Sequence, residues 1–406
     1  MIPFAFMKKS VCLLAVCCAA CSLAAQVPVW NNPSVGGEGK ADSRPEFISY
    51  PTREAGETGD PANAPHYVSL AGKWRAIVST TRQGGEPGFY KPAFTSTAWQ
   101  EVDVPNTSVV QGLSPLEALT PPQLPAEIPL VQYRAVIDVP YLWLDRDMFI
   151  HVEGVGGAYT VYVNDRRIGY SRTPTEFPIS EAVTDGVNTI GIEVYGYSTG
   201  NWMETLLPQL QPGSLGGVYV YSQPKLRIED FVIRTQSDTT KVHGWVDFAV
   251  VMSNSYRSAE KITFGYDIYS PTGKLLTYNL IDTEIPGNST DTLACREVLE
   301  NIWKSTAWSP ERPSLYKLML YTRRDGRITE YIPLKFGFNH AELRDGELWI
   351  NDKKAELSAV DYDAAADAAA TERQLKILKN QRVNTLCVSY PQPHWFYELC
   401  DRIGFY

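Results

Sequence analysis

Hydrophobic and polar residues alternate in short runs between residues 67 and 224, and the runs are rich in β-branched and aromatic side chains. Period-two alternation is typical of half-buried antiparallel strands. Strands are predicted at residues 133–139, 148–153, 159–163, 188–195 and 217–221. The pairs Asn164-Asp165 and Asp185-Gly186 lie between runs and are typical of tight turns. We therefore expect residues 67–224 to form a β-sandwich of the jelly-roll kind.

A second region of alternating residues extends from residue 225 to residue 336. It predicts strands at residues 228–233, 244–251, 261–269, 315–321 and 328–333. The segment from Pro271 to Gly273 has the composition of a turn. Several short strands within roughly 110 residues fit an immunoglobulin-like sandwich.

The pattern changes again at residues 337–406. A hairpin is expected at residues 342–355, followed by a helix at 363–380, a short apolar strand at 385–388 and a second helix at 394–403. Alternation of strands and helices predicts a parallel sheet. A closed (β/α)8 barrel needs about 250 residues, so this segment can supply only the truncated start of such a barrel. The expected fold is mainly β: two sandwiches followed by the first βα units of an incomplete barrel.

The N-terminus predicts export. Lys8 and Lys9 precede an apolar run at residues 11–20, and small residues lie just before Gln26. Residues 1–25 thus resemble a secretory signal peptide, which implies a periplasmic or extracellular protein. Cys21 offers the alternative of a lipoprotein. Residues 26–66 are rich in Gly, Pro and polar residues and predict an extended arm with little structure of its own.

Composition and charge exclude several classes of function. The net charge of −9 argues against nucleic-acid binding, because no basic excess is present to neutralise phosphates. No further segment is long and apolar enough to predict a transmembrane helix. The five histidines are scattered without zinc-binding spacing, and no phosphate-binding or nucleophile motif occurs, so neither a metal nor a cofactor is expected. Cys387 and Cys400 are interpreted as buried apolar residues rather than reactive thiols.

A series of short motifs gives the chain a resemblance to a known family. In chain order they are Trp30-Asn-Asn-Pro, Leu70-Ala-Gly-Lys-Trp, Phe89-Tyr-Lys-Pro-Ala-Phe, Tyr162-Val-Asn-Asp-Arg-Arg-Ile-Gly-Tyr-Ser, Thr175-Glu-Phe-Pro-Ile, Trp308-Ser-Pro-Glu-Arg-Pro-Ser-Leu-Tyr, Gly337-Phe, Asp345-Gly-Glu-Leu-Trp-Ile-Asn and Trp395-Phe-Tyr-Glu-Leu-Cys-Asp-Arg-Ile-Gly-Phe-Tyr. Together they resemble glycoside hydrolase family 2, in particular the amino-terminal portion of its secreted bacterial β-galactosidases. The resemblance implies a jelly-roll domain, an immunoglobulin-like domain and a catalytic barrel, in that order.

The resemblance also implies a retaining mechanism, which uses two carboxylates as acid/base and nucleophile. In the family both are glutamates on later barrel strands, so no catalytic residue is expected within this chain. Four supporting positions depart from the family's pattern. Asn106 lies in a changed loop context, Leu207 stands where an Asp is usual, and the runs beginning at Asp361 and Cys387 lack the expected His and Arg residues. We therefore expect the chain to be inactive alone.

Aromatic and polar residues near the resembling loops could still bind a sugar, because sugar rings stack on Trp and Tyr. One group lies in the sandwich and the other at the broken end of the barrel; ordinary packing remains the alternative for each aromatic residue. The candidate sugar-binding residues are Asn106, Tyr197, Asn201, Trp202, Glu204, Tyr390, His394 and Trp395.

Three hypotheses remain open. The first is an exported protein that no longer catalyses and that binds carbohydrate, such as a galactoside, or a partner. The second is the amino-terminal fragment of an active retaining β-galactosidase. The third is a structural module that docks onto another subunit, with a second polypeptide completing the barrel. Unpaired edges of a parallel sheet would have to be covered in each case.

Overall fold

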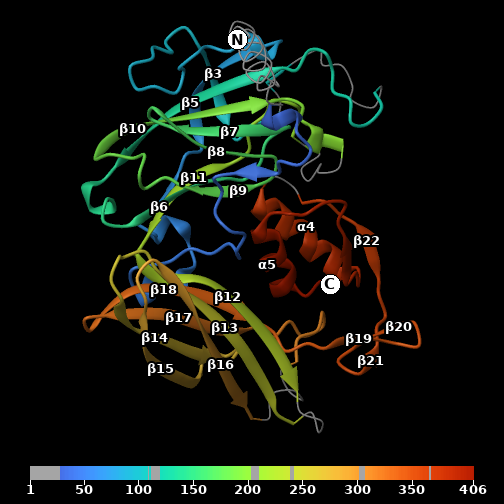
Figure 1. The fold of residues 1–406 in the computed structure, drawn as a ribbon. Helices are drawn as coiled ribbons and strands as arrows, with labels where there is room; N and C mark the ends of the chain where they lie inside the picture. Colours follow the sequence, from blue (N-terminus) through green and yellow to red (C-terminus); the bar gives the residue numbers. More distant parts are fainter. Residues whose placement is uncertain are drawn as a thin grey trace, which may run out of the picture.

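The computed structural model describes residues 28–107, 109–110, 119–202, 210–237, 242–300, 307–364 and 367–406. The predicted signal peptide, Cys21, Leu207 and Glu204 lie outside these residues. The described chain is mainly β and is arranged as two sandwiches and a C-terminal part that contains the long helices (Figure 1). Among the described residues, no helix has both the length and the apolar character needed to cross a membrane.

The first sandwich contains a seven-stranded sheet and a four-stranded sheet. The larger has the order β1 (Gly37–Glu38), β8 (Arg166–Ser171), β7 (Ala158–Val163), β10 (Gly186–Tyr195), β5 (Leu130–Val139), β3 (Gly72–Ser79) and β4 (Gln100–Val104). The smaller has the order β2 (Tyr67–Ser69), β11 (Val218–Gln223), β6 (Asp147–Val152) and β9 (Thr175–Pro178). The predicted strands at 133–139, 148–153, 159–163, 188–195 and 217–221 are all present, with bounds that differ by at most three residues.

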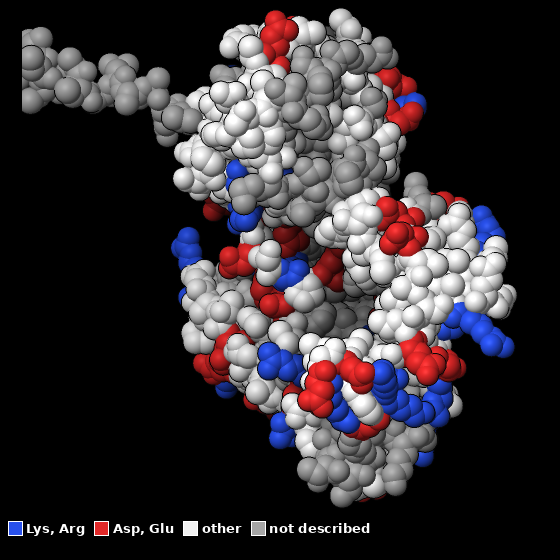
Figure 2. Space-filling model, turned by 90° about the vertical axis from the view of Figure 1, so that its right-hand side faces the viewer, with Lys and Arg blue, Asp and Glu red and all other residues white. Residues whose placement is uncertain are grey.

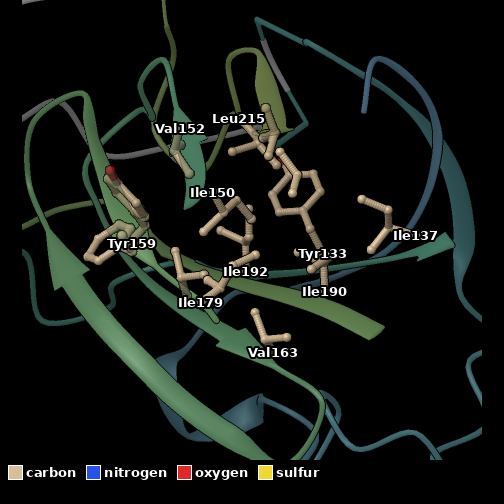
Figure 3. Packing of buried hydrophobic residues seen from close by; sticks show 14 of the residues in the cluster. Tyr133, Ile137, Ile150, Val152, Tyr159, Val163, Ile179, Ile190, Ile192 and Leu215 are labelled. Carbon is tan, nitrogen blue, oxygen red and sulfur yellow. The ribbon is translucent and has the colours of Figure 1, made fainter. Parts of the chain in front are cut away.

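One hydrophobic core lies between these two sheets. Tyr133 and Ile192 from the larger sheet face Ile150 from the smaller sheet, and each is fully or almost fully buried (Figure 3). Alternation along each strand explains the arrangement, because every second side chain points to the same face. Asn164 has a φ of 55°, in the left-handed region that the predicted tight turn between β7 and β8 requires.

The second sandwich also has two facing sheets. They have the orders β12 (Leu226–Ser237), β13 (Gly244–Asn254), β16 (Ser289–Leu299) and β15 (Leu275–Ile285), β14 (Glu260–Tyr269), β17 (Tyr316–Arg324), β18 (Arg327–Phe336). Phe248, Phe264 and Leu318 belong to the buried cluster between the sheets. Strands β15 and β16 were not among those predicted.

The C-terminal part begins with a small antiparallel sheet of β19 (Ala341–Arg344), β20 (Glu347–Ile350) and β21 (Lys353–Lys354). Strands β22 (Ala359–Asp361) and β23 (Thr385–Cys387) then pair in parallel, as the alternation of strands and helices predicted. Helix α4 (Ala368–Asn380) connects them, with the Asp367 carboxylate accepting a hydrogen bond from Ala369 N. Helix α5 (His394–Ile403) has the predicted bounds and ends at Gly404, whose φ is 94°.

The N-terminal arm has more structure than its composition predicts. It contains the 3-10 turns η2 (Val29–Asn31) and η3 (Pro61–Asn63) and the short helix α2 (Arg53–Thr58). Its strand β1 adds to the edge of the larger sheet through β8, and α2 packs against β18 of the second sandwich. The arm thus contacts both sandwiches.

The cysteines correct one expectation. Cys387 is exposed and Cys400 is half-buried, whereas both were interpreted as buried; of the three cysteines that the structure describes, Cys295 is the buried one. All three thiols are free. Cys387 is exposed because side chains alternate along the strand: Leu386 and Val388 pack against the C-terminal core, and Cys387 points the other way.

Trp308 attaches the C-terminal part to the second sandwich. Its indole Nε1 donates a hydrogen bond to the carbonyl oxygen of Asp401 at 2.8 Å, and its ring lies 5.5 Å from that of Tyr406. Its backbone N also donates to Phe338 O at 2.8 Å. The motif that begins at Trp308 therefore holds the end of α5 in place.

We expect Trp308→Phe to loosen this attachment. The substitution keeps a large ring but removes one donor, which should cost about 1 kcal/mol of local stability. Amide hydrogen exchange in α5 should accelerate accordingly, while exchange in β5 and β10 stays unchanged. Trp349→Phe, in the same C-terminal part, is the matched control; equal acceleration in both variants would contradict the assignment.

Candidate functional site

The loops at one end of the first sandwich bring the predicted Asn106 against residues far away in sequence. Its Oδ1 accepts hydrogen bonds from Leu215 N at 3.2 Å and from the Tyr133 hydroxyl at 3.4 Å. Its Nδ2 donates to Asp103 O at 2.9 Å. These hydrogen bonds make the Asn106 side chain a link between two loops. Because Asn106 is half-buried, only part of its side chain faces solvent.

Close backbone contacts hold the neighbouring loops together. Gly213 N donates to Gly156 O at 2.7 Å. Gly157 has a φ of 127°, and a Cβ atom at this position would lie 2.0 Å from Tyr195 O. Only glycine both adopts this positive φ readily and lacks the Cβ atom that would clash. The loop at 154–157 is therefore packed between the segment that follows β10 and the segment that precedes β11.

The predicted residues Tyr197, Asn201 and Trp202 lie together at the 3-10 turn η7 (Thr199–Trp202). Asn201 Oδ1 accepts from Ser198 N at 2.7 Å, which caps the turn. Trp202 is half-buried, and its Nε1 donates to Gln123 O at 2.9 Å. Tyr197 is only 6% exposed, so its ring presents little surface to a ligand. Trp202 is thus the aromatic residue of this group that offers ring surface.

The other predicted group, Tyr390, His394 and Trp395, lies at and just before the start of α5. His394 is exposed, and its Nε2 lies 3.9 Å from Glu398 Oε1 on the next turn. Trp395 is half-buried and packs against the small C-terminal core. This group therefore lies in the C-terminal part, whereas the η7 group lies in the first sandwich.

Gln392 organises the carboxyl ends of the two parallel strands, a role that the sequence did not reveal. This residue is 7% exposed, and its Oε1 accepts from Ala364 N at 2.9 Å after β22. Its Nε2 donates to Tyr390 O at 2.9 Å after β23. Asp363 Oδ1 accepts from Ser389 N at 3.2 Å. These bonds tie the two strand ends to each other.

The strand ends hold little catalytic chemistry. In barrel enzymes, catalytic residues follow the carboxyl ends of the strands. From the last residue of β22 to the start of α4, the described residues contain three carboxylates, Asp361, Asp363 and Asp367, whereas residues 387–393 at the end of β23 contain none. Asp363 and Asp367 accept hydrogen bonds from Ser389 N and Ala369 N. Retaining glycoside hydrolysis needs two carboxylates about 5 Å apart that flank the scissile bond. No cluster of metal ligands occurs in the part of the chain that the structure describes.

A charged network at the junction of the two sandwiches was also missed by the sequence analysis. Arg44, from the arm, pairs with Glu176 at 2.7 Å and donates to Glu229 O at 3.1 Å. Arg227, from β12, pairs with Asp147 of β6 and lies 2.6 Å from Glu229 Oε2. Figure 2 shows positively and negatively charged side chains in the recess between the upper and the lower part of the molecule. The network links the arm and both sandwiches.

A pocket of about 110 Å³ lies beside this network, between residues 42–49 of the arm and the smaller sheet. Burial raises the pKa of Glu176, but hydrogen bonds and charge from His151, Arg44 and Tyr221 outweigh burial and lower it to about 2. Burial also lowers the pKa of His66 at the pocket's edge to about 4. Because Glu176 is ionised and paired throughout the physiological range, we interpret the pocket as part of the structural junction.

Two family models match the chain. One, described as "Glycosyl hydrolases family 2, sugar binding domain", matches residues 91–222. The other, described as "Glycosyl hydrolases family 2", matches residues 226–339. The two matches are consecutive and cover most of the first and second sandwiches.

Curated relatives and solved structures agree with these matches. A β-galactosidase of Priestia megaterium is 28% identical over 93% of this chain and 39% of its own length. One of Streptococcus thermophilus is 30% identical over 83% of this chain and 34% of its own length. The structure of a β-glucuronidase of Bacteroides uniformis matches 84% of the chain with a TM-score of 0.68 at 17% identity. The chain thus spans well under half the length of these relatives and corresponds to their amino-terminal portion.

Proposed function

Because the chain belongs to glycosyl hydrolase family 2, we propose that it is the carbohydrate-recognition portion of a β-galactosidase-like protein and hydrolyses no glycoside by itself. The observation that carries the proposal is that the carboxylates near the two parallel strands all lie at the end of β22, where Asp363 and Asp367 accept backbone hydrogen bonds, and that none follows β23 among the described residues. A carboxylate that completes the pair flanking the scissile bond would have to be supplied by further barrel strands, on the same or another polypeptide.

Recognition is assigned to the loop end of the first sandwich. Trp202 offers a half-buried ring whose position is fixed by its bond to Gln123 O, so a sugar would meet a preorganised surface. Asn106 lies in the same set of loops and retains a partly exposed amide. The name of the matching family model, a sugar binding domain, supports this placement.

The finer architecture is part of the proposal. We assign the first sandwich (67–224) as a jelly roll, the second (225–336) as an immunoglobulin-like domain, and residues 337–406 as the start of a (β/α)8 barrel. The strand orders, the parallel pair β22 and β23 and the structural similarity to a β-glucuronidase support this assignment. We also infer export through the signal peptide predicted at residues 1–25.

Binding of galactose tests the recognition role. We expect the purified chain to bind galactose weakly and Trp202→Ala to weaken binding about fivefold, since loss of a stacking ring removes on the order of 1 kcal/mol. Chemical-shift titration by NMR measures this. Tyr141→Ala, which removes an exposed aromatic ring from η6 (Tyr141–Trp143) of the same sandwich, should leave binding unchanged. Equal affinity in the Trp202 variant would refute the assignment of the loop end.

A second candidate function is that of an amino-terminal portion of an active hydrolase. It is favoured by the relatives, which extend far beyond the part that this chain matches. The intact mass of the native polypeptide distinguishes the two functions. A mass that corresponds to residues of about 26–406 supports recognition alone, whereas a mass several hundred residues larger supports the hydrolase.

A further inference from the structure

A second pocket, of about 210 Å³, lies on the outer face of the seven-stranded sheet, away from the sandwich core. Its lining comes from β5, β7 and β10 and from the loop at residues 85–90. The outward side chains of these strands are Gln132, Tyr162 and Glu193, while Val131, Val161 and Val194 point into the core. The pocket is therefore open to solvent and is separate from the hydrophobic core.

The floor of the pocket is a preorganised carboxylate. Glu193 Oε1 accepts a hydrogen bond from Gln132 Nε2 at 2.9 Å, and Glu193 Oε2 accepts one from the Tyr195 hydroxyl at 2.6 Å. Gln132 is only 3% exposed, and its Oε1 in turn accepts from Glu86 N at 2.8 Å. The Tyr162 hydroxyl also hydrogen-bonds to Glu193. Because each carboxylate oxygen can accept two hydrogen bonds, Glu193 keeps one acceptor position for a ligand.

The wall of the pocket is aromatic and held firmly. Tyr90 stacks on Tyr162 with ring centroids 4.2 Å apart. The loop that carries Tyr90 is fixed by Arg134, which donates to the carbonyl oxygens of Phe89, Lys91 and Pro92 at 2.7, 3.0 and 3.3 Å. A Cβ atom on Gly191 would lie 2.8 Å from Tyr90 Cβ, so glycine permits this close approach of loop and sheet.

The pocket combines an acceptor-rich floor with apolar walls formed by rings, Leu130 and Pro87. Its volume lies below the roughly 300 Å³ at which pockets for drug-sized ligands begin, so it suits a ligand of one ring. A pyranose matches these properties, because its hydroxyl groups donate hydrogen bonds and its C–H face packs against apolar surface. We propose that this pocket binds a single neutral pyranose unit, with Glu193 accepting a hydrogen bond from one of its hydroxyl groups.

This site goes beyond the proposed function, because none of its lining residues belongs to the loop-end set of Asn106, Asn201 and Trp202. It would give the first sandwich a second contact with a polymeric or branched glycan. The carboxylates of Glu86 and Glu193 also set its selectivity, since like charges repel. A uronic acid should therefore bind more weakly than the neutral sugar.

The test is an NMR titration of the full chain with two neutral hexoses, galactose and glucose, with an anionic sugar, glucuronate, and with a small organic cation, ethanolamine. We expect saturable shifts of amides at residues 85–90 and 192–194 with a neutral hexose, and binding at least tenfold weaker for Glu193→Gln. Asp138→Asn, at an exposed position on the same sheet, is the matched control and should bind like the unmodified protein. Circular dichroism verifies that each variant is folded.

The outcomes separate this site from the loop end. Loss of the shifts at 85–90 in Glu193→Gln, with those around Trp202 retained, supports the proposal; the reverse pattern is expected for Trp202→Ala. Absence of saturable shifts at 85–90, equal affinity in Glu193→Gln, or tighter binding of glucuronate or ethanolamine than of the hexose would each overturn it.

Discussion

Replacing Arg227 with alanine should reduce the free energy of unfolding by about 3–5 kcal/mol, the cost of leaving a buried charge without its partner. The Arg227 side chain is 6% exposed and lies between Asp147 of the first sandwich and Glu229 of its own strand. Ser255 Oγ also donates to Asp147 Oδ2 at 2.5 Å. Alanine would leave two carboxylates facing each other at the junction, so the two sandwiches should lose their fixed contact.

Urea unfolding followed by circular dichroism measures this loss. The matched control is Arg296→Ala, because Arg296 also forms a close pair, with Asp247 at 2.5 Å, but its side chain is 61% exposed. An exposed pair contributes at most about 1 kcal/mol. Similar losses of unfolding free energy in the two variants would show that burial does not account for the effect of the Arg227 substitution.

The pH dependence of stability should depend strongly on Glu330. This residue on β18 is 1% exposed, and burial raises its pKa to about 7, although hydrogen bonds from Ile228 N and Thr322 and the charges of Arg227 and Arg146 act in the opposite direction. The folded protein therefore holds this proton more tightly than the unfolded chain. Stability from this group is fully present below pH 4.5 and is lost as the pH rises through about 7.

Glu330→Gln removes this titration while keeping the shape of the side chain. Relative to the unmodified protein, the variant should gain about 2–3 kcal/mol of unfolding free energy between pH 5 and pH 8, as the shift in pKa requires. His66 titrates in the opposite sense, but it is present in both proteins and cancels in the difference. A difference that is constant with pH would contradict the account of Glu330.

Local sequence patterns predicted those elements in which one face is buried. Helix α5 has the predicted bounds because its apolar positions recur at helical spacing and Gly404 supplies the left-handed residue at its end. Strand β15 was not predicted, because it is an edge strand with most of its residues exposed and so lacks clear alternation. Helix α4 begins at Ala368 rather than at residue 363, because Asp367 caps it.

The site was harder to predict because its geometry depends on contacts between residues distant in sequence. Asn106 was recognised from its motif, but its partner Leu215 is 109 residues away. The roles of Arg44 and Gln392 could not be predicted, since a single arginine or glutamine carries no local signal of its partners. Tyr197 was predicted as a sugar platform from its position, but burial leaves it little surface.

Hydrolysis of aryl glycosides by the purified chain tests the central claim most directly. The chain should release no more nitrophenol from p-nitrophenyl β-galactoside or β-glucuronide than a mock purification, because the carboxylates at its described parallel strands all lie at the end of β22, whereas retaining hydrolysis needs a pair that flanks the scissile bond. Release that increases with protein concentration and persists after further purification would show that the chain contains a complete catalytic site, and would contradict its assignment as a recognition portion.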